Sequence, residues 1–204
     1  MKLYHSPQAP NPDRVVYFLR AKGKLDAVEL AEVSIMKQEH KQADYRAVSP
    51  YSQVPALILD DGTNITESRA ICTYFEGIFP EPNLMGKDPK EKALIEMWDR
   101  RIELMLFVQF ATWFRNSHPA MAPLEVPQNA EAAAKGEKAA KKMAERLDAH
   151  LAEHDFVAAD RFSIADITLY ITCGFARVMK WAPHKELPNL GRWHAAMSER
   201  GFAG

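Results

Sequence analysis

Short apolar runs alternate with helical patterns over the first eighty residues of the chain. Residues 2–5 and 27–33 have the length and apolar character of strands, and residues 37–48 are polar, as in a short irregular helix. A helix is predicted between the two strands, on an apolar face made of Val15, Val16, Phe18 and Leu19. We expect Asn11 at its N-cap and Pro12 at its first helical position.

A hairpin and a further helix complete the pattern of this half. In "VPALILDDGTNIT", apolar residues flank Asp61-Gly62, a pair suited to a tight primed turn between two strands. Residues 67–79 then show helical spacing. The predicted order is strand, helix, strand, helix, strand, strand, helix. This order is typical of an α/β thioredoxin-like domain, which we place at residues 1–80.

The rest of the chain is predicted to be all-helical. Prolines and a glycine concentrate in "FPEPNLMGKDP", which indicates a linker over residues 81–88 before a helical domain at residues 89–204. Helical spacing is found over residues 89–118, 130–153 and 188–200. In "FSIADITL", Ser163 and Asp166 are three residues apart, as in a variant of the capping box, and predict the start of another helix.

Composition and charge exclude several classes of protein. The 204 residues are 47% hydrophobic and 26% charged, as in an ordinary globular protein. The net charge of -1 at pH 7 gives no general attraction to nucleic acid or to an anionic membrane. No apolar run reaches the roughly 18 residues of a membrane span. We therefore expect neither a nucleic acid nor a membrane as a partner.

The cysteines and the N-terminus favour a cytoplasmic protein. Cys72 and Cys173 lie far apart in apolar segments, as buried and reduced thiols do. With no CxxC pair and no Cys/His cluster, we expect no metal site. The start "MKLYHSP" lacks the charged, apolar and small-residue pattern of a secretory signal.

Two short motifs carry the most specific chemistry. Pro55 precedes a predicted strand, where a proline is tolerated best with a cis peptide or at a sheet edge. A cis peptide would leave the N–H and C=O of Val54 free to pair with an extended peptide. Ser68 lies at a helix start, where a hydroxyl and the helix dipole favour a carboxylate, and Glu67 could hold an ammonium group. The motifs predict a site for an α-amino acid head group; the alternative is a helix capped after a turn.

The whole chain resembles the cytosolic glutathione transferases, because "QVPAL", "ESRAI", the proline-rich linker and "FSIADITLY" match that family in order and spacing. The resemblance implies a homodimer that uses glutathione as a co-substrate, with no tightly bound cofactor. It implies that Val54 pairs with the cysteinyl backbone of glutathione, that the Pro55 peptide is cis, and that Glu67 and Ser68 hold the γ-glutamyl end.

Two further positions match the family. His40 and Gln53 correspond to residues that contact the glycine carboxylate of glutathione in some classes. For His40 the alternative is a solvated histidine in a polar segment.

The opening turn departs from the main classes of that family, which place Tyr, Ser or Cys beside the glutathione sulfur. "APNPDRV" and "EMWDRRIEL" look most like an atypical branch, found in fungi and proteobacteria, that lacks all three. The resemblance implies that Asn11 contributes to the thiolate site, although it could serve only as an N-cap. It also implies a water held by Ser117 and His118 in "FRNSHP", whose alternative role is to end a helix. Ser6 lies too far back in the turn to reach the sulfur.

The substrate and the reaction follow from the same resemblance. The segment from Met105 to Phe114 is apolar almost all round, which is typical of buried core, yet part of it could line a pocket for apolar electrophiles. The candidates are Phe107, Phe110, Trp113 and Phe114. We expect the glutathione thiolate to attack a small electrophilic substrate. The alternatives are a glutathione-dependent disulfide reductase and a glutathione-binding protein without turnover.

Overall fold

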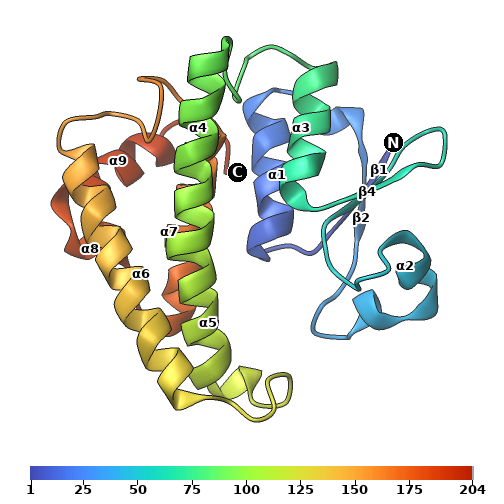
Figure 1. Cartoon of the computed structure of the whole chain (residues 1–204). Helices are drawn as coiled ribbons and strands as arrows, with labels where there is room; N and C mark the ends of the chain where they lie inside the picture. The colour runs from blue at the N-terminus through green and yellow to red at the C-terminus, as the bar shows by residue number, and fades with distance from the viewer. Residues whose placement is uncertain (204) are drawn as a thin grey trace. The chain divides into compact units, whose positions relative to one another are not determined.

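The structure, a computed structural model, describes residues 1–203 and divides into two compact units, which we treat separately (Figure 1). The first unit comprises Met1–Leu84 and also, from the end of the chain, Phe202 and Ala203. The second unit comprises Met85–Gly201. Among the described residues, no helix has the length and apolar character needed to cross a membrane.

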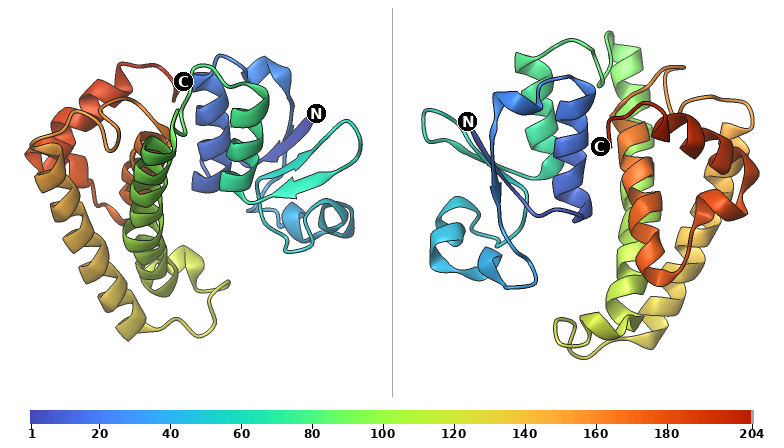
Figure 2. Two further views of the ribbon diagram at one scale, coloured as in Figure 1. Left: turned by 45° about the horizontal axis from the view of Figure 1, so that its top comes forward. Right: turned by 180° about the vertical axis from the view of Figure 1, so that it is seen from behind.

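The first unit has the predicted element order. It runs through β1 (Lys2–His5), α1 (Pro10–Ala21), β2 (Glu29–Glu32), α2 (Ala43–Val48), β3 (Ala56–Ile58), β4 (Asn64–Thr66) and α3 (Ser68–Ile78). The sheet order is β2-β1-β3-β4, with β1 and β2 parallel and the other pairs antiparallel. Helices α1 and α3 lie side by side against one face of the sheet, and α2 lies on its other side (Figure 2). This arrangement confirms the α/β thioredoxin-like domain.

A buried lysine ties the ends of α1 and α3 together. The Lys22 ammonium pairs with Glu76 at 2.7 Å and donates to the carbonyls of Phe79 and Pro82, each at 2.8 Å. The chain then leaves α1 through Gly23, whose φ of 62° is the left-handed conformation that glycine adopts readily. Burying an ammonium is tolerated because its donors are satisfied.

The hairpin exists, but its turn is not the predicted two-residue primed turn. The N–H of Gly62 donates to Leu59 O at 3.0 Å, and the N–H of Leu59 donates to Thr63 O at 2.9 Å, which leaves a three-residue loop. A primed turn of the predicted type needs positive φ at both central residues, whereas only Gly62 of this loop has one, at 85°. The Asp61 carboxylate accepts the Thr63 N–H at 2.9 Å and holds the loop.

The second unit is all-helical, as predicted. Its helices are α4 (Pro89–Ile102), α5 (Val108–Ser117), α6 (Ala130–Leu151), α7 (Ile164–Ala176), α8 (Pro183–Glu186) and α9 (Pro188–Ser198). A π-helical segment, Glu103–Phe107, joins α4 to α5. Helix α6 packs against α5 through Gly136, where a Cβ would lie 2.6 Å from Gln109 O. Only a residue without a side chain permits this approach.

The predicted capping box at the start of α7 is confirmed, and it belongs to a larger buried network. One oxygen of the Asp166 carboxylate accepts the Ser163 N–H at 2.9 Å and the Ser163 hydroxyl at 3.1 Å. The other accepts the Val157 N–H at 2.9 Å and Trp193 Nε1–H at 3.0 Å. Complete burial raises the pKa of Asp166 to about 6 despite these four donors.

Candidate active site

A cleft opens in the first unit. It is formed by the start of α1, the segment between α2 and β3, and the junction of β4 with α3. The residues that line it are Asn11, Ser49, Tyr51, Gln53, Val54, Pro55, Thr66, Glu67 and Ser68. The fold therefore brings the opening turn together with both sequence motifs. Each motif lies more than forty residues after Asn11 in the chain.

The start of α1 corrects one sequence prediction. The N–H of Asp13 donates to Ala9 O at 3.0 Å, so Ala9 is the N-cap and the helix begins at Pro10. Asn11 is therefore the second helical residue, not the N-cap, and Pro12 is the third. A proline fits the first position because the N–H there has no partner within the helix.

This arrangement leaves one backbone N–H donor at the N-terminus of α1. Prolines at positions 10 and 12 have no N–H, so the Asn11 N–H is the single backbone donor among the first three helical residues. No residue within 1–203 accepts a hydrogen bond from it, and α1 has no side-chain cap. The helix dipole and this N–H both face the cleft end of α1 and favour a negative charge.

The junction of β4 and α3 places two further polar residues at the cleft, Glu67 and Ser68. Glu67 is the exposed N-cap residue of α3, and its φ of 67° is rare for a residue other than glycine. The buried Ser68 hydroxyl accepts a hydrogen bond from Arg14 Nη1 at 2.7 Å. Because the guanidinium only donates, the Ser68 hydrogen is directed elsewhere, and it is available to a carboxylate in the cleft.

The segment before β3 presents a peptide edge. The peptide bond between Val54 and Pro55 is cis, as expected. Within the described chain, the N–H and C=O of Val54 have no hydrogen-bond partner. The Gln53 side chain is exposed beside them. An extended peptide can pair with Val54 as with the edge of a sheet.

His40 is not among the residues that line the cleft. It lies in a short helical turn, Glu39–Lys41, where partial burial lowers the pKa of its imidazole. Its Nδ1 is buried.

Ser117 and His118 lie in the second unit, at the end of α5. The Ser117 hydroxyl donates to Trp113 O at 2.8 Å. His118 Nδ1 accepts the N–H of Ala120 at 3.2 Å and so caps the short turn that follows. In this structure both residues serve the end of the helix.

The four predicted pocket residues differ in exposure. Phe110 is fully buried, whereas Phe107, Trp113 and Phe114 are partly exposed. Three of the rings meet Phe175, with centroid distances of 6.1 Å for Phe107, 5.2 Å for Phe110 and 5.4 Å for Phe114. The segment from Met105 to Phe114 is not buried all round, because Met105 and Val108 are each 41% exposed.

Comparison with known proteins identifies the family. Residues 3–83 match the N-terminal domain of glutathione S-transferases, and residues 103–201 match the C-terminal domain. The chain belongs to the glutathione S-transferase family. Glutathione S-transferase 2 of Saccharomyces cerevisiae is 35% identical over 201 residues, which cover 98% of this chain and 86% of that protein. The protein is thus a glutathione transferase.

Solved structures agree with this assignment. A glutathione S-transferase domain-containing protein of Marinobacter aquaeolei VT8 has 37% identity and a TM-score of 0.94, with both chains fully covered. Gtt2 of Saccharomyces cerevisiae has 35% identity and a TM-score of 0.92, covering 100% of this chain and 98% of that one. The likeness to the yeast protein is consistent with the atypical branch inferred from the opening turn.

Three cleft residues of this glutathione transferase were missed by the sequence motifs: Ser49, Tyr51 and Thr66. Thr66 directly precedes Glu67, and the other two lie within five residues of Val54. Their closeness to the motifs along the chain was the available signal. Their side chains carry no charge, and hydroxyls of this kind are common in turns, so nothing else singled them out.

Proposed function

We propose that the protein binds glutathione along the cleft of its first unit and conjugates the thiolate to small apolar electrophiles. The observation that carries this proposal is that one cleft holds the Asn11 N–H, the Val54 peptide edge and the Ser68 hydroxyl. Glutathione needs partners of these three kinds: donors for its thiolate, a backbone edge for its cysteinyl residue and a donor for its α-carboxylate.

The remaining contacts follow the charges of glutathione. Glu67 faces the α-ammonium group, and the start of α3 adds its dipole to the Ser68 hydroxyl at the α-carboxylate. Gln53 donates to the glycine carboxylate, and His40 stays a candidate for the same group. The aromatic residues Phe107, Phe110, Trp113 and Phe114 are proposed for the electrophile pocket; of these, Phe107, Trp113 and Phe114 are partly exposed.

The sulfur in this scheme belongs to glutathione, and the start of α1 ionises it. A free thiol has a pKa of about 8.5, and a decrease of about two units corresponds to about 2.7 kcal/mol. Hydrogen bonds from the Asn11 N–H and side-chain amide to a thiolate at a helix N-terminus are of the right strength. Ser6 is buried and takes no part. Ser117 and His118 are the next candidates.

The proposal extends to the organisation of the protein. We place the glutathione-binding domain at residues 1–80, the linker at 81–88 and the helical domain at 89–204. The protein acts as a cytoplasmic homodimer, uses glutathione as a co-substrate and serves detoxification.

Titration calorimetry with glutathione tests the binding site. Ser68→Ala removes a hydrogen bond to a charged group, so the dissociation constant should rise about 10- to 100-fold. Glu67→Ala should weaken binding as well. Thr73→Ala is the matched control, because this exposed hydroxyl lies on the same helix and donates to Arg69 O at 3.0 Å, outside the cleft. Unchanged affinity in both cleft variants would refute the site.

The reaction is tested by comparing an aromatic halide with a glutathione mixed disulfide as substrates. Faster turnover of the halide supports conjugation, whereas faster turnover of the disulfide supports the reductase. Binding without either turnover would leave a carrier of glutathione. Titration of the bound thiolate by its ultraviolet absorbance should give a higher pKa in Asn11→Ala and no change in Ser6→Ala.

A further inference from the structure

Two hydroxyl groups donate to a single backbone carbonyl beside the cleft. The Tyr45 hydroxyl donates to Gln53 O at 2.6 Å, and the Ser49 hydroxyl donates to the same oxygen at 2.9 Å. The N–H of Gln53 donates back to Ser49 Oγ at 3.3 Å. A carbonyl oxygen accepts through two lone pairs, so both are occupied. The direction of this carbonyl is therefore fixed by the protein.

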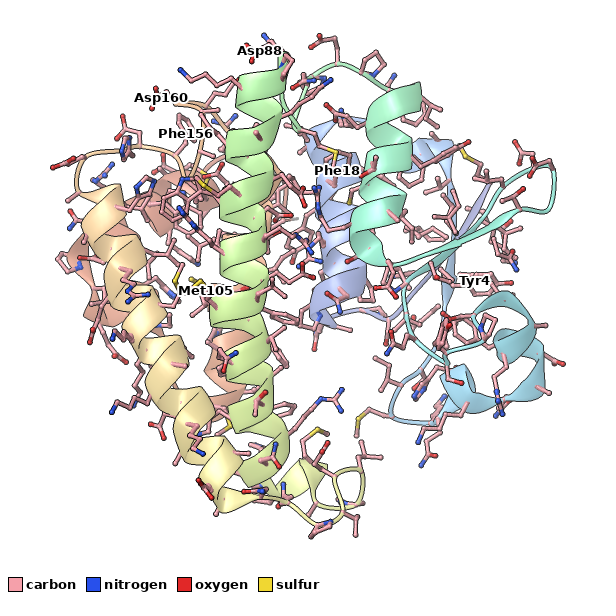
Figure 3. The ribbon with its side chains drawn as sticks, in the orientation of Figure 1. Tyr4, Phe18, Asp88, Met105, Phe156 and Asp160 are labelled. Carbon is pink, nitrogen blue, oxygen red and sulfur yellow. The ribbon has the colours of Figure 1, made fainter. Side chains whose placement is uncertain are left out.

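Tyr45 lies in α2, and Ser49 is the residue that directly follows this helix. Tyr45 and Ser49 are four residues apart and so lie on one face, and the Ser49 N–H donates to Tyr45 O at 2.9 Å. The Tyr45 ring belongs to a buried cluster with Val33 and Ala56 and meets the edge of Tyr4 at 5.6 Å; Figure 3 shows Tyr4 beside α2. Burial raises the pKa of Tyr45 to about 12, so its hydroxyl keeps its hydrogen at neutral pH.

The fixed carbonyl determines where the next N–H points. The Gln53–Val54 peptide is a planar trans unit, in which the C=O and the N–H point in opposite directions. Because the Tyr45 and Ser49 hydroxyls bind Gln53 O, the Val54 N–H points away from them. The Val54 side chain packs against the same cluster as Tyr45, which fixes the residue at its other end. Val54 lines the cleft, and its N–H has no partner within residues 1–203.

We propose that Tyr45 and Ser49 are positioning residues for glutathione, which hold the Gln53–Val54 peptide so that the Val54 N–H is presented to the cysteinyl carbonyl. They act through their hydrogen bonds to Gln53 O; Ser49 also lines the cleft, whereas Tyr45 is not among its lining residues. This inference rests on the proposed function. Because the Val54 N–H is already oriented, glutathione binding does not include the entropic cost of ordering the segment around Gln53 and Val54. The contact is the same in the bound ground state and in the transition state, so it affects KM and not kcat.

The variants Tyr45→Phe and Ser49→Ala test the proposal. Each loses one hydrogen bond to Gln53 O, and the dissociation constant and KM for glutathione should rise about 3- to 10-fold. The kcat and the pKa of the bound thiol should stay at the wild-type values. Tyr4→Phe is the matched control, because it removes a hydroxyl from the same cluster of rings without touching Gln53. Tyr45→Phe keeps the buried ring, so it preserves the fold.

A ligand fragment separates positioning from a general loss of structure. γ-Glutamylethylamide retains the γ-glutamyl end but has no carbonyl at the cysteinyl position. Its affinity, measured by competition, should be equal in wild type and variants. Equal weakening of the fragment and of glutathione would overturn the proposal, as would variants that bind glutathione like wild type. A wild type that does not bind glutathione would instead refute the proposed function itself.

Discussion

The helices α1 and α7 begin in opposite ways. At α7, the Asp166 carboxylate binds the Ser163 N–H and hydroxyl, so the helix start is closed by its own side chains and buried. At α1, Ala9 offers no side-chain cap, and two prolines remove N–H groups that would need one. The Asn11 N–H is left at the cleft. The start of α7 is thus satisfied within the protein, whereas the start of α1 leaves a donor that our proposal assigns to a ligand.

Two other helices that begin away from the cleft have side-chain caps, whereas α2, α8 and α9 begin without one. Asp88 caps α4 by accepting the N–H groups of Lys90 and Glu91, and Asn129 caps α6 by accepting the N–H of Ala132. Helix α3, which begins at the cleft, has no side-chain cap at Glu67. A cap contributes about 1 kcal/mol. Both helices that begin at the cleft, α1 and α3, lack this stabilisation, and so do α2, α8 and α9.

The largest effect on stability is expected when the capping residue of α7 is removed. Asp166→Ala leaves Trp193 Nε1–H and the Val157 N–H buried without an acceptor. Each such donor costs about 1–3 kcal/mol, so the free energy of unfolding should fall by about 3–5 kcal/mol. Urea denaturation followed by circular dichroism measures the loss.

The control for that variant is Asp88→Ala, which removes a solvent-accessible cap and should cost about 1 kcal/mol. Both variants should bind glutathione with wild-type affinity at temperatures where they are folded. An Asp166→Ala protein as stable as Asp88→Ala would contradict the view that the buried network, and not the cap alone, stabilises α7.

The converse experiment introduces a side-chain cap at the start of α1. Ala9 already has the extended backbone of an N-cap residue, with φ -87° and ψ 129°, so Ala9→Asp can accept the Asn11 N–H. We expect the free energy of unfolding to rise by about 0.5–1 kcal/mol. The pKa of bound glutathione should rise by about one unit, equivalent to about 1.4 kcal/mol, because the donor is taken and a like charge lies nearby.

Thermal denaturation and thiolate titration of the same samples measure the two effects of Ala9→Asp. Ala9→Gly is the control, since it adds neither a cap nor a charge. A more stable Ala9→Asp protein with an unchanged thiol pKa would show that the start of α1 takes no part in ionising the thiol.

The sequence predicted the elements well because their signals are local. Strand-length apolar runs, helical spacing and the "FSIAD" box each depend on a few neighbouring residues, and the structure has these elements, with α8 and the π-helical segment Glu103–Phe107 in addition. The two errors concern details that one residue decides. The first hydrogen bond of α1 is accepted by the carbonyl of Ala9, a residue that has no capping side chain. The turn of the hairpin is determined by the positive φ of Gly62.

The cleft was harder to predict because it is assembled across the chain. Asn11, Val54 and Ser68 were found because each lies in a motif, and the cleft contains all three. The Tyr45 and Ser49 hydroxyls were not found, since their importance comes from a shared contact with Gln53 O that only the fold creates. A hydroxyl that acts on a backbone carbonyl leaves no charge or spacing signal in the sequence.

The smallest expected effect concerns Asp13, the acidic residue in the first turn of α1. Partial burial raises the pKa of Asp13 to about 6. A hydrogen bond from the Gln8 backbone and the charge of Arg20 lower this pKa, but they do not outweigh the burial. The folded protein therefore binds this proton more tightly than the unfolded chain, and the stabilisation is lost as the pH rises through 6. Because the carboxylate is only partly buried, solvent screening limits the effect to below about 1 kcal/mol.

The free energy of unfolding of wild type, relative to Asp13→Asn, should thus increase by about 0.5–1 kcal/mol when the pH falls from about 7 to about 5. Denaturant titrations of both proteins at matched pH values measure this difference. Asp61→Asn is the control, because hydrogen bonds from Thr63 lower the pKa of Asp61 and move its titration below this pH range. A wild type that loses stability relative to Asp13→Asn on acidification would mean that the Asp13 carboxylate acts as a stabilising cap. The start of α1 would then be partly closed like that of α7, and the contrast between the two helices would rest on Asn11 alone.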